Sequence, residues 1–428
     1  MTYNFIHKRV RSVRAMTLAL AIGLVVMAQF VFQNTVAYGQ RATLRPGGAA
    51  SRGVQNANRG ELTIGTDPFA ARSNREARSE QAPGVASDAT LTSSESDIAN
   101  TSVGGELDYP DIVRFNNGRV LTCRVEGISG RTGATLATAQ GQVIVSLTEL
   151  ESLEVATSAA FLSGVACYES WEELGARAQL QRAASYFEQA RAQSTRRIER
   201  EWATAKLAQV RHALGDYQRA AEEFFVLCRA DGYTAYLSSI PLRWQNQRLS
   251  FGVSEGVELA SSAQKWLQER ENPSARLLAA SILLNSSGAT GERALATLQA
   301  LASSAGSDEN VDEERTMRNI SLLATAQLWR RTLLSGVKAT DVAKWRGTVT
   351  LLPEQLRSGP SSVVAHGYKS LGMDAEALHF FLLSGLLGAQ DYETSRASCQ
   401  EASAALERLG RTWESQCLRT ETERRYER

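Results

Sequence analysis

The chain has 428 residues, enough for two to four domains of ordinary size, and 43% of them are hydrophobic, so at least one part can bury a sizeable core. Lysine and arginine number 47, against 46 aspartate and glutamate residues. This balance excludes a strongly basic nucleic-acid-binding protein and an acidic solvating protein on global grounds. Four histidines and five cysteines leave little material for a metal site.

The first 39 residues have the three parts of a secretory signal peptide. Residues 1–15 are basic and contain no acid, residues 16–32 are almost entirely apolar, and Ala37-Tyr38-Gly39 fits the small-x-small rule for cleavage before Gln40. An uncleaved anchor is the alternative, because the apolar run is at the short limit of the roughly 17–25 residues that span a bilayer. Both interpretations predict an exported protein of the periplasm or cell envelope, with residues 16–32 as a membrane anchor in the second case.

Residues 40–106 form a predicted disordered linker. They are rich in Ala, Ser, Gly, Thr and Arg, and their few apolar residues keep neither a period of 2 nor one of 3.6. Such a segment cannot bury enough surface to offset the entropy of ordering it. The linker is either a spacer that holds the folded part away from a membrane or a leader that is dispensable after processing. The sequence leaves both open.

Residues 107–158 predict a small β module. Asn116-Asn117-Gly118 supplies a tight hairpin turn, and Gly127, Gly130 and Gly133 indicate a hairpin loop rather than a phosphate cradle, because their run does not open a helix after a strand. Five short strands in about fifty residues form a meander or a small open barrel. The strand-like runs are 111–115, 119–127, 135–139, 142–147 and 148–153.

The start of this module resembles short β modules found in many exported bacterial proteins. The residues that carry the resemblance are Asp111, Val113, Phe115, Asn117, Gly118, Leu121 and Val125. The pattern is loose and covers about an eighth of the chain.

Residues 160–428 predict a helical domain with an internal repeat. Proline nearly vanishes, and Ala, Leu, Arg, Glu and Gln dominate, as helices prefer. Segments 201–234 and 358–391 share a pattern in which a glycine-containing turn precedes a small residue and then an aromatic residue four positions later. The residues that define the pattern are Leu207, Gly215, Tyr217, Ala220 and Phe224 in the first copy, and Tyr368, Gly372, Ala377 and Phe381 in the second.

This pattern resembles the tetratricopeptide (TPR) repeat, a 34-residue helix-turn-helix unit. The family's Trp, Gly, Tyr and final Pro positions are Thr204, Ala208, Arg211 and Gly232 here, so the copy is degenerate. The resemblance implies a mainly α fold, in which about five to seven helical hairpins stack as a right-handed TPR-like α-solenoid behind the β module. The alternative is an irregular α-helical domain without a superhelix.

The resemblance also implies a binding surface. In solenoids of this kind the first helix of each hairpin lines the concave side, where Trp202 offers an apolar anchor and Lys206 and Lys369 offer contacts to carboxylate or phosphate. Packing of Trp202 against the neighbouring hairpin is the open alternative. The expected partner-binding residues are Trp202, Lys206, Gln209, His212, His366 and Lys369.

The sequence predicts no catalytic residue, no cofactor and no metal site. It contains no G-x-S-x-G, H-E-x-x-H, Walker A or C-x-x-C motif, and no two histidines have the i, i+4 spacing of a helical metal site. The run 196–200 and the tail 419–428 mix charges as solvated helix faces do. Cys399 and Cys417 are either a disulfide across a helical hairpin or buried free thiols that behave as small apolar residues.

These observations favour an exported, non-catalytic scaffold that binds a protein or peptide partner through its TPR-like helical array. They indicate no nucleic acid and no small-molecule substrate. The alternative is an envelope-associated structural or cell-wall-binding protein, in which the β module contacts polysaccharide or peptidoglycan and the helices oligomerise. Exposed aromatic residues on the β module would favour this alternative, and Phe115 is the residue the sequence offers for it.

Overall fold

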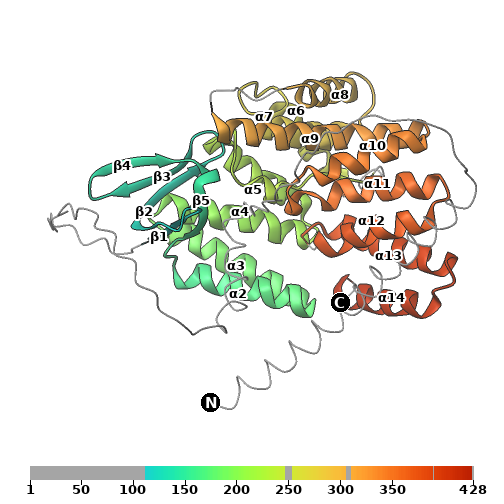
Figure 1. Ribbon diagram of the computed structural model, residues 1–428, viewed down its shortest axis with the longest axis horizontal. Coiled ribbons are helices and arrows are strands. Elements are labelled where there is room, and N and C mark those ends of the chain that lie inside the picture. The colour runs from blue at the N-terminus through green and yellow to red at the C-terminus, as the bar shows by residue number, and fades with distance from the viewer. Residues whose placement is uncertain (1–110, 246–252, 305–309, 389, 427–428) are drawn as a thin grey trace, which may run out of the picture. The chain divides into compact units, whose positions relative to one another are not determined.

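The computed structural model describes residues 111–426 apart from three gaps, at 246–252, 305–309 and 389 (Figure 1). All of the described residues belong to one structural unit. The expected signal peptide (residues 1–39) and linker (residues 40–106) lie outside them. Within the described residues a small sheet precedes a mainly helical part, as expected, and no helix there is both long and apolar enough to cross a membrane.

The β module is a five-stranded antiparallel sheet with the strand order β4-β3-β2-β1-β5. The chain meanders from β1 to β4 and returns through the 3-10 helix η3 (Leu147–Glu149) to pair β5 with the other side of β1. Among the described strands β4 and β5 are the open edges, so the module is an open sheet and not a barrel. The strands are β1 (Asp111–Phe115), β2 (Val120–Ser129), β3 (Gly133–Thr138), β4 (Gly141–Val145) and β5 (Leu150–Glu154).

Alternation along the strands puts one face of the sheet in the core. In β1, Asp111, Val113 and Phe115 are buried on the same face, because side chains two apart in a strand point the same way. Two glycines fix the turns. Gly118 has φ +82° in the expected turn between β1 and β2, and a Cβ on Gly130 in the β2–β3 loop would lie 2.1 Å from the carbonyl oxygen of Tyr233. The glycine run therefore belongs to a hairpin.

Helices α2 to α14 follow the sheet, and helices consecutive in the chain pack against one another within α2–α5, α6–α9 and α10–α14. Figure 1 shows α11 to α14 lying side by side. The α-helices are α2 (Ala159–Leu174), α3 (Arg177–Gln193), α4 (Arg197–Ala213), α5 (Tyr217–Ala230), α6 (Val253–Trp266), α7 (Pro273–Leu283), α8 (Ala289–Ala302), α9 (Val311–Ser335), α10 (Ala339–Thr350), α11 (Ser358–Ser370), α12 (Asp374–Leu387), α13 (Tyr392–Arg408) and α14 (Thr412–Tyr426), with the 3-10 helices η4 (Leu237–Ser239) and η5 (Glu354–Leu356) between them.

The two predicted repeat copies are the hairpins α4–α5 and α11–α12. All of their defining apolar residues are buried, with Ala220, Phe224, Ala377 and Phe381 completely so. The turns of α4–α5, α11–α12 and α13–α14 share one geometry. In each, a glycine with φ between +71° and +78° donates to the carbonyl three residues back, and the next residue donates to the carbonyl five residues back. The hairpins are thus built alike, while the resemblance to the TPR family stays a prediction.

The first and last helical hairpins are in contact, which the expected open solenoid does not allow for. A Cβ on Gly175, at the end of α2, would lie 3.1 Å from the Cα of Arg425 in α14. The guanidinium carbon of Arg177 in α3 lies 5.9 Å from the ring centroid of Tyr392 in α13. In an open array each hairpin contacts mainly its neighbours. Here the two ends of the helical part meet, and the helices enclose an inner face.

Candidate functional site

The positions expected to line an open concave surface are covered. On α4 these are Trp202, Lys206, Gln209 and His212, and all four are buried. Helix α2 covers two of them, because the Trp202 ring lies 6.1 Å from that of Phe161 and the Nζ of Lys206 lies 5.1 Å from the ring centroid of Tyr168. Lys206 also donates to Gln209, with Nζ 3.2 Å from Oε1. The exposure expected for Lys206, Gln209 and His212 is wrong, because all three are buried. For Trp202 the structure has the open alternative, packing against the neighbouring hairpin.

The expected positions on the second copy lie nearer to solvent, but both have partners. Lys369 Nζ donates to the two carboxylate oxygens of Glu401 at 2.7 and 2.6 Å. His366 is half-buried and lies edge-on to Phe381, with 5.0 Å between ring centroids. Burial lowers the pKa of His366, and Lys369 lowers it further, against the opposing effect of Glu401. His366 is therefore a neutral packing residue at pH 7.

The inner face of the helical part is filled by a segment of the chain itself. This inner segment, Leu237–Gln245, begins with η4 and continues without regular structure. Leu242 and Trp244 are buried within it, and Trp244 lies so close to α11 that a Cβ on Gly359 would lie 2.0 Å from its indole ring. The inner face of the helical part is thus occupied by residues 237–245.

Three helices hold the inner segment through its main chain. From α5, the Tyr217 hydroxyl donates to the carbonyl oxygen of Pro241 at 2.6 Å. From α7, Ser281 Oγ accepts the Arg243 backbone N–H at 2.9 Å. From α9, Arg330 donates to the carbonyl oxygens of Arg243 and Gln245 at 2.7 and 3.0 Å. These contacts are made to the main chain, so they do not depend on which side chains the inner segment carries.

Arg330 is the residue on which this arrangement depends most. It is the largest fully buried side chain among the described residues, and burial lowers its pKa to about 9, with Arg243 nearby acting in the same direction. A buried guanidinium must place its donors on acceptors. Two of its acceptors are the carbonyls of the inner segment and a third is the Gln327 Oε1 at 2.5 Å.

His212 and Asp391 meet beside the inner segment. The Nε2 of His212 lies 3.5 Å from Oδ1 of Asp391, and Asp391 also accepts the Thr394 backbone N–H at 3.0 Å, capping α13. The cavity next to this pair, lined also by Tyr217 and Trp244, has a volume of about 20 Å³. That is room for one water, whereas pockets for small molecules measure roughly 300–1,000 Å³. The pair joins α4 to α13.

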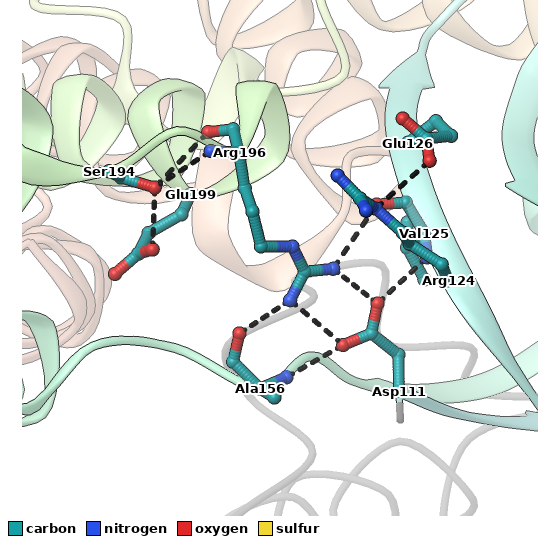
Figure 2. A network of polar contacts seen from close by, with 8 residues as sticks. All are labelled: Asp111, Arg124, Val125, Glu126, Ala156, Ser194, Arg196 and Glu199. Carbon is teal, nitrogen blue, oxygen red and sulfur yellow. Dashed lines mark hydrogen bonds and ion pairs between the residues drawn. The ribbon is translucent and has the colours of Figure 1, made fainter. Parts of the chain in front are cut away.

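A buried ion pair joins the sheet to the helices (Figure 2). The guanidinium of Arg196, at the start of α4, contacts both carboxylate oxygens of Asp111, the first residue of β1. Arg196 also donates to the carbonyl oxygens of Ala156 and Val125, and Asp111 accepts the backbone N–H groups of both residues. Glu199 next to it accepts the N–H of Ser158 at 2.7 Å. The expectation that residues 196–200 form a solvated helix face is wrong for Arg196 and Glu199, which are buried.

The β2–β3 loop and the end of β4 are tied to the helices at a second place. Asp231 accepts the Gly130 N–H at 3.1 Å, and the hydroxyl of Thr316 in α9 donates to the Gly130 carbonyl oxygen at 2.8 Å. Asp312, at the start of α9, accepts the Leu147 N–H with both carboxylate oxygens at 3.1 Å. The sheet is therefore fixed to α4 and α9. Phe115, the aromatic residue that a sugar-binding β module would need, is buried beneath the Arg119 guanidinium.

The most exposed large apolar side chain of the described residues is Trp413, the second residue of α14, which is 73% exposed. Leu409, the C-cap of α13, is 41% exposed, so the α13–α14 turn presents two apolar side chains to solvent. Charged pairs flank them. Arg411 binds Glu414 at 3.0 Å and Arg408 binds Asp374 at 2.7 Å. An aromatic residue with a charged rim is the usual composition of a protein–protein contact.

The second alternative, buried free thiols, is confirmed for Cys399, while for Cys417 the expected burial is wrong. Cys399 and Cys417 are both free, the first buried and the second exposed on α14.

Comparison of the chain with protein-family models, with curated proteins and with solved structures finds no match.

Several of these residues carry a signal in the sequence. Asp111 lies on the same face of β1 as the buried residues Val113 and Phe115. A carboxylate buried on that face requires a buried hydrogen-bond donor. Arg196, its partner, is hidden among the arginines of the run 196–200. The inner segment has no periodicity, so no pattern indicates its place. Trp413 is followed by a polar helix, and that combination does indicate an exposed aromatic residue.

Proposed function

We propose that this chain is an exported scaffold that binds a protein or peptide partner through its helical hairpins and carries out no catalytic step itself. The shared turn geometry of three hairpins supports a repeated helical framework, and such frameworks commonly present binding surfaces. The proposal of export rests on the basic, apolar and small-residue series of residues 1–39. The place of action is then the periplasm or the cell envelope.

The partner binds at the α13–α14 turn, and not on the first helices of the hairpins. The observation that carries this placement is the 73% exposure of Trp413. The first helices are unsuitable, because α4 is covered by α2 and the inner face is filled by the inner segment. An indole left in water has a large apolar area available for burial, and Trp is enriched among the residues that dominate binding energy.

The site suits a partner that offers an apolar pocket with charges around it. Trp413 fills the pocket, and Leu409 extends the apolar contact toward α13. The ion pairs of Arg411 with Glu414 and of Arg408 with Asp374 form a rim that sets the orientation of the partner rather than its affinity.

Co-purification from the cell-envelope fraction tests the proposal. The mature chain and its Trp413→Ser variant are isolated in parallel, and the accompanying proteins are quantified by mass spectrometry. We expect at least one protein to be lost about tenfold or more from the variant, as for a binding hot spot of roughly 2 kcal/mol. Gln416→Ala and Thr420→Ala, which change exposed residues of the same helix, serve as controls and should retain that protein. The same proteins with all four chains would contradict the placement.

N-terminal sequencing tests the proposed export separately. The mature chain should begin at or within a few residues of Gln40, after the small-x-small site. Recovery of intact Met1 in the membrane fraction would instead indicate an anchor formed by residues 16–32.

A further inference from the structure

We propose that the chain forms a symmetric dimer in which strand β4 pairs with β4 of a second copy, so that the two sheets become continuous. This proposal is independent of the partner site at Trp413, because it rests on another part of the molecule. It begins from the position of β4, which among the described strands has a neighbour, β3, on one side only. Figure 1 shows the β3–β4 hairpin extending beyond the helices.

The register of the hairpin shows which backbone groups of β4 are directed to its open edge. Thr138 pairs with Gly141 across a two-residue loop, and Leu136 pairs with Val143. In such a hairpin the residues that flank the loop form a hydrogen-bonded pair, and these pairs then recur at every second residue. The carbonyl oxygen of Val145 is accordingly on the β3 side, 2.2 Å from where a Cβ of Gly133 would lie. Gln142 and Ile144 therefore direct their N–H and C=O groups outward.

Strand β4 has no sequence feature that would discourage its pairing with another strand. No charged residue and no proline occur between Arg131 and Glu149. Exposed edges are usually protected by charges, proline or a bulge. The opposite edge has such protection, because β5 carries Glu151 and Glu154.

The side chains of β4 also favour a partner strand. Val143 is 46% exposed and Ile144 is 61% exposed, and they lie on opposite faces of the strand. A neighbouring strand would cover apolar surface on both faces at once. β-Branched residues are the ones that pack best in this position.

A second copy of the same strand is the partner that matches these features. Antiparallel pairing about a two-fold axis at Val143 sets Gly141 opposite Val145 and Gln142 opposite Ile144, so all five residues of β4 are paired. The outward groups of Gln142 and Ile144 then bond to those of the other copy, and no like charges meet. A charged peptide would find no opposite charge on this strand. Because five residues bury little area, the dimer is weak and reversible.

Disulfide trapping tests the register directly. In this arrangement the two Val143 residues form a non-hydrogen-bonded pair, whose Cα atoms lie about 4.5 Å apart, within disulfide reach. The full chain carrying Cys417→Ser and Val143→Cys is oxidised with copper–phenanthroline and examined on a non-reducing gel. The matched control carries Ile144→Cys in the same background, where the two cysteines are diagonal neighbours beyond disulfide reach. We expect about tenfold more covalent dimer from Val143→Cys than from Ile144→Cys. Equal yields, or no dimer from Val143→Cys, would overturn the proposal.

Sedimentation of the unmodified chain gives the second test. Its weight-average mass should rise from that of one chain toward that of two between about 1 and 100 μM. Ile144→Pro removes only an outward N–H and should leave the chain a folded monomer, with circular dichroism unchanged. A chain that stays monomeric over this range, or an Ile144→Pro variant that is folded and still dimeric, would contradict β4 pairing.

Discussion

Asp111 and Arg196, which are 85 residues apart in the chain, form an ion pair in which the carboxylate is completely buried and the guanidinium is only 8% exposed. Asp111 begins the sheet and Arg196 is the N-cap of α4, so the pair connects the first strand to the helical part. A sheet of five short strands has little core of its own. Its place against the helices therefore depends on polar contacts of this kind as well as on apolar packing.

Removing one member of this pair should destabilise the fold strongly. We expect Asp111→Asn or Arg196→Met to lower the free energy of unfolding by about 3–5 kcal/mol, because each leaves a buried group without its counter-charge. The double variant should cost clearly less than the sum of the two single variants. Urea denaturation of all four chains measures this. Glu126→Gln, which removes the exposed pair with Arg124 at 3.1 Å, is the control and should cost about 0–1 kcal/mol. Additive costs of the two buried changes would show that the residues are not coupled.

The hairpin core gives a second prediction. Phe224→Ala should lower the free energy of unfolding by about 3–5 kcal/mol, and Ala220→Leu should lower it by about 1–3 kcal/mol through overpacking. Lys206→Ala should also cost about 1 kcal/mol, because Lys206 is buried against Tyr168 and bonded to Gln209. Lys369→Ala, which removes a partly exposed ion pair, should cost less than this. Thermal and urea unfolding provide the measurement, and a cost below about 1 kcal/mol for Phe224→Ala would be inconsistent with its burial.

Arg330→Lys should loosen the inner segment. A lysine cannot reproduce the forked contact to the carbonyl oxygens of Arg243 and Gln245, so we expect a loss of about 1–3 kcal/mol. Limited trypsin digestion followed by mass spectrometry provides a local readout, because Arg243 lies within the inner segment. Cleavage after Arg243 should be faster in the variant than in the wild type. Arg331→Lys, a change at the exposed neighbouring position, should leave that cleavage rate unchanged.

His366 predicts a pH dependence of stability. Its folded-state pKa is below the ordinary value of 6.5, because burial disfavours the imidazolium. Below pH 6.5 the unfolded chain therefore binds more protons than the folded chain, so the contribution of His366 to stability is present above pH 6.5 and is lost as the pH falls below it. The free energy of unfolding of the wild type should fall more steeply between pH 7 and pH 5 than that of His366→Gln. Parallel curves for the two chains would contradict a buried neutral imidazole.

Local patterns in the sequence predicted the elements well but not how distant elements meet. The period-2 runs of the β module correspond to strands of the structure, and Ala220 and Phe224 are in the core, because the side-chain period decides which face is buried. The pattern also placed Trp202 and His212 on one face of α4. It could not show that α2 and α13 cover that face, since those contacts join residues far apart in the chain.

The candidate site could be predicted only in part, for a related reason. Lys369 lies on the first helix of the second repeat copy, where the repeat pattern puts it. Its ion-pair partner Glu401 belongs to the next hairpin, which that pattern does not describe. The inner segment has no periodicity of apolar residues. Nothing in the sequence around Arg330 distinguishes it from other helical arginines, because its acceptors, the carbonyl oxygens of Arg243 and Gln245, are distant in the chain. Polar residues whose partners come from other elements are the ones that sequence patterns describe least.

Photo-crosslinking from position 413 tests the proposed partner site most directly. A benzophenone-bearing amino acid is incorporated in place of Trp413 in cells, with separate chains carrying it at Thr420 and at Lys369. Thr420 is an exposed position on the same helix, and Lys369 is a partly exposed one of the positions first expected to bind. Our account predicts a covalent adduct with one partner protein from position 413 and none from the other two. An adduct from position 369 without one from position 413 would contradict binding at the α13–α14 turn and favour the first helices instead.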